Sequence, residues 1–218
     1  DGGLWRDKGR ACDHAARMLE EGAQVIDVGG ESTRPGASGV DEDEEMDRVI
    51  PVVDWIARNL DVMISVDTSR PEVIRQAVAH GAHVWNDIRA LQLDGALEEA
   101  GRLDIPVILM HMQGKPRTMQ VAPHYKDVVR EVGDFLIGRA DAAMAAGVRR
   151  ENIILDPGFG FGKSAEDNFR LLDRLQDLVA LGYPVLSALS RKSMLGAATG
   201  IKKASDRVAS SVAGHLIS

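Results

Sequence analysis

Six short runs of apolar residues recur along the chain, and each one stops at a polar residue. Most of the runs are rich in β-branched side chains, which favour extended backbone. Continuous apolar runs of this length are typical of strands in a parallel sheet that is buried on both faces. The sequence therefore predicts strands within residues 23–30, 62–69, 83–88, 107–112, 152–158 and 184–193.

The segments between these runs have helical patterns with recognisable starts and ends. Ser69 and Ser164 each precede an acidic residue three positions later, which is the pattern of a capping box. Asp41 begins an acidic cluster that suits a helix N-terminus, where the helix dipole favours negative charge. Gly81 and Gly147 fall where helices are expected to stop. Strands and helices therefore alternate along the chain.

This alternation predicts an α/β fold, either a doubly wound sheet or a (β/α)8 TIM barrel. Polar residues follow at least five different strands, which favours the barrel because its active site collects residues from all strand ends. A doubly wound sheet would concentrate them near one switch point. Only six strands are counted, and residues 1–10 and 205–218 do not resemble strands. Either the chain is a fragment lacking the first and last strands, or the barrel assignment is wrong.

Composition narrows the class of protein further. The chain has 218 residues, of which 27% are charged and 44% hydrophobic, and its net charge is -7. This charge argues against non-specific nucleic-acid binding, which needs a basic face. The single cysteine, Cys12, suits a reducing cytoplasm, and no apolar run approaches the length of a membrane span. No repeat or linker is evident, so residues 1–218 are expected to form one domain.

Five polar residues at the predicted strand ends are candidates for a common site. They are three carboxylates, one amide and one ammonium group: Asp27, Asp67, Asn86, Asp156 and Lys192. Each carboxylate alone could simply cap the next helix. For Asp67, the neighbouring Ser69 offers a rival cap, which frees the carboxylate for a ligand. Their coincidence at five strand ends is the stronger argument for a polar pocket.

The run DPGFGFGKS, residues 156–164, has the look of a phosphate-binding loop but not its spacing. A P-loop has four residues between its first glycine and the Gly-Lys-Ser ending, and here only three separate Gly158 from Gly162. The next helix has its own cap in Ser164. Asp156 therefore stands on a stiff, glycine-rich support, and we expect it to bind a ligand.

Two loops suggest that the ligand is anionic or electron-rich. Residues 29–37 carry two hydroxyls and a guanidinium, and residues 190–193 carry two cations and two hydroxyls, although either segment could be a plain solvated turn. The histidines lack zinc-ligand spacing. His111 and Cys12 are expected to pack in the interior, and Ser190 lacks the GxSxG pattern of serine hydrolases.

Six motifs occur in an order and spacing that closely resemble the dihydropteroate synthase family of the folate pathway. They are GGESTRPGA, SVDTS, NDI, LMHMQG, LDPGFGFGK and SRKSMLG, and the resemblance covers nearly the whole chain. It implies a (β/α)8 barrel that joins p-aminobenzoate to 6-hydroxymethyl-7,8-dihydropterin pyrophosphate. The products would be 7,8-dihydropteroate and pyrophosphate, with Mg²⁺ attending the leaving group. Departure of pyrophosphate would leave a pterin-methyl cation, which the aryl amine attacks.

The resemblance also implies roles for individual residues. The pterin would be bound by Asp67, Asn86, Asp156, Lys192, Phe161 and Met110. Asp67 and Lys192 would be the catalytic residues. Thr33 would contact the pyrophosphate, and p-aminobenzoate would lie against Thr33, Arg34, Pro35, Phe161 and Ser193. No metal ligand is assigned within the chain, because the usual asparagine ligand of the family would precede residue 1.

Two family motifs are missing from the sequence: the Asn-x-Thr-Pro segment on the family's first strand, just before Asp1, and the Arg-x-His segment on its last strand. The 218 residues alone are therefore expected to be poorly stable and catalytically weak or inactive. A complete protein is expected to be a cytoplasmic homodimer that acts on small molecules, without nucleic-acid or membrane partners. A pterin-dependent methyltransferase on the same barrel remains an alternative. So does a non-catalytic pterin-binding module, and more remotely a barrel enzyme for phosphorylated sugars.

Overall fold

The computed structural model describes residues 4–32, 39–114 and 118–218. Its strands are β1 (Val25–Gly29), β2 (Met63–Asp67), β3 (Val84–Asp87), β4 (Val107–Met110) and β5 (Ile153–Asp156). Its α-helices are α1 (Lys8–Glu20), α2 (Glu42–Asn59), α3 (Pro71–Ala79), α4 (Ala96–Leu103), α5 (Val128–Ala145), α6 (Ala165–Asp173), α7 (Leu175–Val179), α8 (Ser193–Thr199) and α9 (Val208–Ile217). Five of the six predicted strands are thus present at the predicted places.

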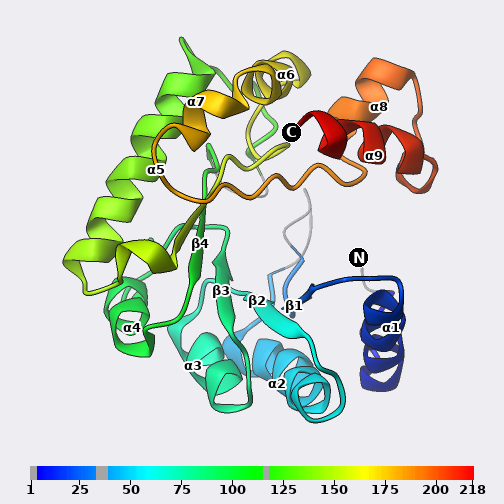
Figure 1. Ribbon diagram of the computed structural model, residues 1–218, viewed down its shortest axis with the longest axis vertical. Coiled ribbons are helices and arrows are strands. Elements are labelled where there is room, and N and C mark those ends of the chain that lie inside the picture. The colour runs from blue at the N-terminus through cyan, green and yellow to red at the C-terminus, as the bar shows by residue number, and fades with distance from the viewer. Residues whose placement is uncertain (1–3, 33–38, 115–117) are drawn as a thin grey trace.

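The five strands form one parallel sheet whose spatial order follows the chain, from β1 to β5. Each of the helices α2 to α5 packs against the next one along the outer side of the sheet (Figure 1). A doubly wound sheet would change direction and carry helices on both faces. Consecutive parallel strands with helices on one side are the arrangement of a barrel wall.

The sixth predicted strand, within residues 184–193, is reduced to a single parallel bridge between Val185 and Leu155. The N–H of Leu186 donates to the carbonyl of Leu155 at 2.8 Å, and the pairing then stops. Further along, the N–H groups of Leu189 and Arg191 donate to side chains of α9. The backbone leaves the sheet because its donors are satisfied by α9.

The predicted helix caps have mixed outcomes. Asp41 caps α2, accepting from the N–H of Glu44 at 2.8 Å, and Ser164 forms a capping box with Asp167 at the start of α6, both as predicted. The prediction for Ser69 was wrong. Arg70 is the N-cap of α3 without a side-chain hydrogen bond, and the Ser69 hydroxyl donates to the buried Asp87 instead.

The interior is a single apolar cluster between the sheet and the outer helices. Trp85 on β3 is fully buried, and its indole N–H donates to the carbonyl of Thr68 at 2.7 Å, which ties β3 to the turn after β2. Cys12 is buried in α1, as expected for a packed thiol. Within the described residues, no helix is both long and apolar enough to cross a membrane.

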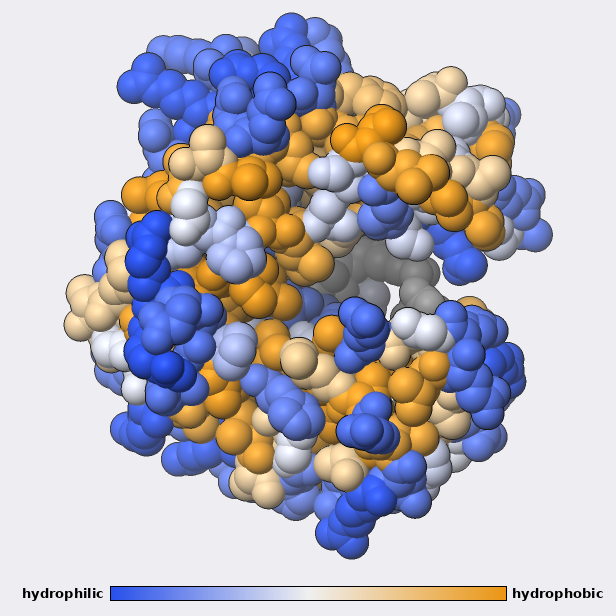
Figure 2. Space-filling model, viewed as in Figure 1, coloured by the Kyte–Doolittle hydropathy of each residue, from blue (hydrophilic) through white to orange (hydrophobic). Residues whose placement is uncertain are grey.

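The face of the molecule seen in Figure 2 is hollowed between the segment that carries α8 and α9 and the segment that carries α1. Apolar side chains of α9 are exposed on the surface, with Val208, Val212, Leu216 and Ile217 all more than half accessible. Hydrophilic and hydrophobic residues are interspersed over the rest of this face (Figure 2).

Candidate active site

The structure places three of the five candidate polar residues at or near the carboxyl ends of strands, and Lys192 in the segment that follows the single bridge at Val185. Asp67 and Asp156 end β2 and β5, Asn86 lies near the end of β3, and Lys192 immediately precedes α8. Asp27 lies in the middle of β1, because that strand continues two residues further than its apolar run indicated. The carboxyl ends of parallel strands lie along one rim of the sheet, so Asp67, Asn86 and Asp156 lie along the same rim.

Asp27, Asp67 and Asn86 form the first of two groups on this rim. The Asn86 amide donates to both carboxylate oxygens of Asp27, at 3.4 and 3.3 Å. Asp27 is open to solvent on one side, but the surrounding protein desolvates it and raises its pKa. Desolvation also raises the pKa of Asp67 well above its usual range, and the charges of Asp27 and Asp87 add to this effect. The group therefore favours a ligand that brings positive charge or hydrogen-bond donors.

Asp156 is the centre of the second group. Its side chain is buried, and its Oδ1 accepts from the N–H of Gly158 at 2.7 Å. Burial raises the pKa of Asp156 to about 6, although that hydrogen bond and the ammonium groups of Lys192 and Lys163 act in the opposite direction. A buried carboxylate with its orientation fixed by the backbone is suited to accept hydrogen bonds from a ligand.

Three other predicted residues lie around Asp156. The Lys192 ammonium is 4.5 Å from the centre of the Phe161 ring, within cation–π range. Burial lowers the pKa of Lys192, while the Asp156 carboxylate opposes this shift. Met110 is buried at the end of β4, in register with Asp156. Ser193 is exposed at the first position of α8.

Sequence reasoning assigned no role to Lys163, yet the structure buries it beside this group, with 3% of the side chain accessible. Its ammonium donates to the carbonyls of Gly158 and Phe161, both at 3.0 Å, and lies 2.9 Å from Nδ1 of His111. Burial lowers the pKa of Lys163 to about 7. The lysine was visible in the glycine run, but lysines are mostly exposed, so nothing local in the sequence signals its burial.

His111 is packed in the interior, as predicted. Its ring meets the Phe135 ring edge-on with 5.0 Å between centres, and burial lowers its pKa to about 3. The imidazole is therefore neutral at physiological pH. A neutral ring can accept a hydrogen bond from the Lys163 ammonium through Nδ1.

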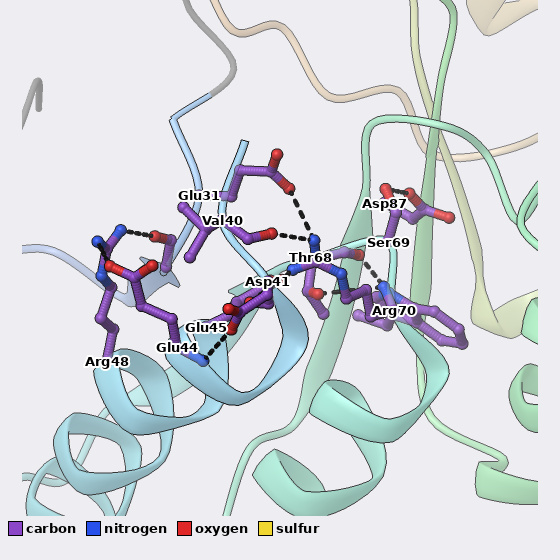
Figure 3. A network of polar contacts seen from close by, with 12 residues as sticks. Glu31, Val40, Asp41, Glu44, Glu45, Arg48, Thr68, Ser69, Arg70 and Asp87 are labelled. Carbon is purple, nitrogen blue, oxygen red and sulfur yellow. Dashed lines mark hydrogen bonds and ion pairs between the residues drawn. The ribbon is translucent and has the colours of Figure 1, made fainter. Parts of the chain in front are cut away.

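A polar network connects the turn between β2 and α3 with α2 and with the segment after β1 (Figure 3). Arg70 pairs with the buried carboxylate of Glu45, donates to the carbonyl of Val40, and lies 3.9 Å from Glu31. Arg48 also donates to the carbonyl of Gly30 at 2.8 Å. One arginine thus contacts residues on both sides of the segment that contains Thr33, Arg34 and Pro35.

We expect Arg70→Met to lower the free energy of unfolding by about 3 kcal/mol, because it leaves the buried Glu45 carboxylate without its partner. Adding Glu45→Gln should recover part of this loss, since a neutral amide costs less to bury. Urea denaturation of both single variants and the double variant measures the coupling. Strictly additive losses would contradict the pairing.

The predicted residues Thr33, Arg34 and Pro35 lie outside the described residues. In residues 4–32, 39–114 and 118–218, no three His, Cys, Asp or Glu side chains converge closely enough to hold a metal ion. The described candidate residues thus form two groups: two carboxylates and an amide in one, and a carboxylate, two ammonium groups and an aromatic ring in the other.

A family model described as "Pterin binding enzyme" matches residues 1–218, the whole chain. The chain belongs to the pterin-binding enzyme family. Dihydropteroate synthase of Haemophilus influenzae is 49% identical over 217 residues, and the match covers 100% of this chain and 78% of that relative. The sequence resemblance to the dihydropteroate synthases is therefore confirmed.

Solved structures of pterin-binding enzymes agree with this assignment. Xanthomonas albilineans dihydropteroate synthase with 4-aminobenzoic acid matches with a TM-score of 0.93 and 49% identity, covering 100% of this chain and 77% of that one. Yersinia pestis dihydropteroate synthase in a sulfonamide drug complex matches with a TM-score of 0.96 and 47% identity, covering 100% and 78%. The barrel fold class predicted from the sequence is confirmed by these neighbours.

Proposed function

We infer that this protein is a transferase that carries out the dihydropteroate synthase reaction of folate biosynthesis. The amine of p-aminobenzoate replaces pyrophosphate on 6-hydroxymethyl-7,8-dihydropterin pyrophosphate. A C–O bond to pyrophosphate breaks, a C–N bond forms, and the amine loses one proton. The observation that carries this proposal is the oriented, buried Asp156 beside Lys192 and Phe161, in a chain that is 49% identical to a dihydropteroate synthase over its whole length.

The pterin would be recognised mainly by Asp156. A pterin presents an amino group and a ring N–H side by side, and one carboxylate accepts both as a bidentate pair. Lys192 would donate to the ring acceptors of the pterin, and Phe161 and Met110 would provide apolar contact. Asn86, held by its bonds to Asp27, would complete the polar rim of the pocket.

Asp67 and Lys192 would have the catalytic roles. Loss of pyrophosphate leaves positive charge on the pterin methyl group, and a nearby carboxylate stabilises such a charge electrostatically. The charges of Asp27 and Asp87 already raise the pKa of Asp67 on top of its desolvation, so arrival of a cation relieves this repulsion. Lys192 would hold the pterin in register while the bond breaks.

We expect Asp67→Asn to lower kcat by roughly 100-fold or more while changing pterin affinity much less, because the charge is needed only when the cation forms. Steady-state kinetics with both substrates measures the two effects. Asp61→Asn, which neutralises an exposed carboxylate two residues before β2, is the matched control. A kcat within about threefold of the wild-type value would contradict the role of Asp67.

Thr33 would contact the pyrophosphate, and Thr33, Arg34, Pro35, Phe161 and Ser193 would form the p-aminobenzoate site. Mg²⁺ would accompany the pyrophosphate, as is usual for the family. The described residues alone supply no set of three ligands for it, so no step is derived through the metal. We also propose, from the family resemblance, a homodimeric protein, and a cytoplasmic location remains a prediction.

Incubation of the protein with the dihydropterin pyrophosphate and p-aminobenzoate tests the proposal. Equal amounts of 7,8-dihydropteroate and pyrophosphate are expected, detected by chromatography and a pyrophosphate assay. Pterin binding without product would indicate the non-catalytic module, and methyl transfer from a methylated pterin would indicate the methyltransferase. We prefer the synthase because the relatives described above are synthases.

A further inference from the structure

The glycine-rich turn after β5 is packed directly onto the backbone that follows β4. A Cβ atom at Gly158 would overlap the carbonyl of His111, and one at Gly162 would overlap the carbonyl of Gln113. The hydroxyl of Tyr125 donates to the carbonyl of Gly162 at 2.7 Å. Two segments that are distant in sequence therefore meet backbone to backbone beneath Asp156.

Lys163 lies at the centre of this contact. Its ammonium donates to Gly158 and Phe161 on the turn and, at 3.3 Å, to the carbonyl of His111 on the other segment. Gly158 is consequently held at both of its backbone groups, since its N–H donates to Asp156 while its carbonyl accepts from Lys163. One buried cation thus connects the end of β4, the turn, and the residue that orients the carboxylate.

We propose that Lys163 is a positioning residue for the pterin site: it fixes the turn that orients Asp156 and, together with Lys192, supplies positive charge that favours the ionised form of this carboxylate. The inference rests on the proposed function for the identity of the ligand. The contacts and the charge of Lys163 are features of the chain itself. Lys163 does not contact the substrate in this scheme; it acts through Gly158 and Asp156.

The charges around Lys163 favour this role. Asp156 faces it from β5, Asp167 from α6, and Lys192 from the segment before α8. His111, at the end of β4, is neutral because burial lowers its pKa to about 3, and Tyr125 is neutral because burial raises its pKa. The carboxylate of Asp156 opposes the desolvation that lowers the lysine pKa, and the lysine in turn opposes the desolvation that raises the pKa of Asp156.

The test is the pH dependence of the affinity for a reduced-pterin analogue, followed by Trp85 fluorescence or calorimetry. Wild-type affinity should fall as the pH drops through about 6, where Asp156 becomes protonated. In Lys163→Met this fall should begin about one pH unit higher, because an opposite charge has been removed from near the carboxylate. Lys163→Gln should show the same shift but lose less affinity at high pH, since its amide still donates to the turn.

Lys126→Met removes an exposed lysine from the neighbouring segment and should keep the wild-type profile. The proposal is overturned if the affinity of both Lys163 variants falls at the same pH as that of the wild type. If Lys163→Met does not fold, the result for Lys163→Gln decides alone. A ligand-free measurement separates this outcome from failure of the proposed function. In ¹³C NMR, the Cε signal of Lys163 is identified as the lysine signal that titrates near pH 7 and is absent from Lys163→Gln. In Asp156→Asn this signal should titrate at lower pH. An unchanged midpoint would overturn the coupling between the two residues, even if no pterin bound.

Discussion

Asp156→Asn is expected to reduce the affinity for the pterin by roughly 100-fold or more at pH 7.5. The asparagine keeps an acceptor for the Gly158 N–H but turns a donor toward the amino group and ring N–H of the ligand. Two charge-assisted hydrogen bonds are lost, each contributing about 1.5–3 kcal/mol. Titration with a reduced-pterin analogue measures the loss. Asp173→Asn, on the exposed side of α6, is the control.

The same variant should not weaken the fold at neutral pH. Burial raises the pKa of Asp156 to about 6 in the folded protein, above its ordinary value of 3.8, so the folded state binds the proton more tightly than the unfolded state. The stabilising contribution of this proton is full below about pH 3.8 and is lost as the pH rises through about 6. At pH 7.5 the wild-type carboxylate is buried as a charged group, and asparagine removes the free-energy cost of burying that charge. Thermal unfolding at pH 7.5 should therefore show a Tm no lower than that of the wild type; a large drop would mean that the carboxylate stabilises the fold.

Gly158→Ala is expected to be the most damaging single-atom addition near the site, lowering the free energy of unfolding by about 3 kcal/mol or more. The residue has a φ of 66°, in the left-handed region, and its Cβ would overlap the backbone carbonyl of His111. Neither segment can move without breaking the contacts of Lys163 with both of them. Urea denaturation measures the loss.

Gly200→Ala separates the effect of the φ angle from that of the overlap. Gly200 has a similar φ of 73°, but a Cβ there would meet no atom within 4 Å. Its substitution should cost only about 1 kcal/mol, the usual penalty for the left-handed conformation. Equal losses in the two variants would mean that packing against His111 does not matter.

The regular part of the fold could be predicted because its signals are local. Five apolar runs became β1 to β5, and Asp41 and Ser164 cap helices as their sequence contexts indicated. Ser69 had an equally good local pattern, but its hydroxyl bonds to Asp87, 18 residues away. The segment at 184–193 also looked like a strand, and contacts with α9 draw its backbone away from β5. Both failures come from partners that lie far away in the sequence.

The positions of the candidate site residues could be predicted where they depend on local signals. Strand ends located Asp67, Asn86 and Asp156, because parallel strands present their carboxyl ends at one rim. The burial of Lys163 and the pairing of Arg70 with Glu45 were not foreseeable, since each depends on how separate loops close over one another. No motif at Lys163, Arg70 or Glu45 itself records these contacts.

The strands have the same order in the sheet as in the chain, and this affects how the sheet can form during translation. β2 pairs with β1, β3 with β2, β4 with β3 and β5 with β4, so each strand finds its neighbour already made when it leaves the ribosome. During translation the sheet can grow one strand at a time. The growing edge belongs to the most recently synthesised strand and is exposed only until the next strand is made, whereas the outer edge of β1 has no partner among the described strands.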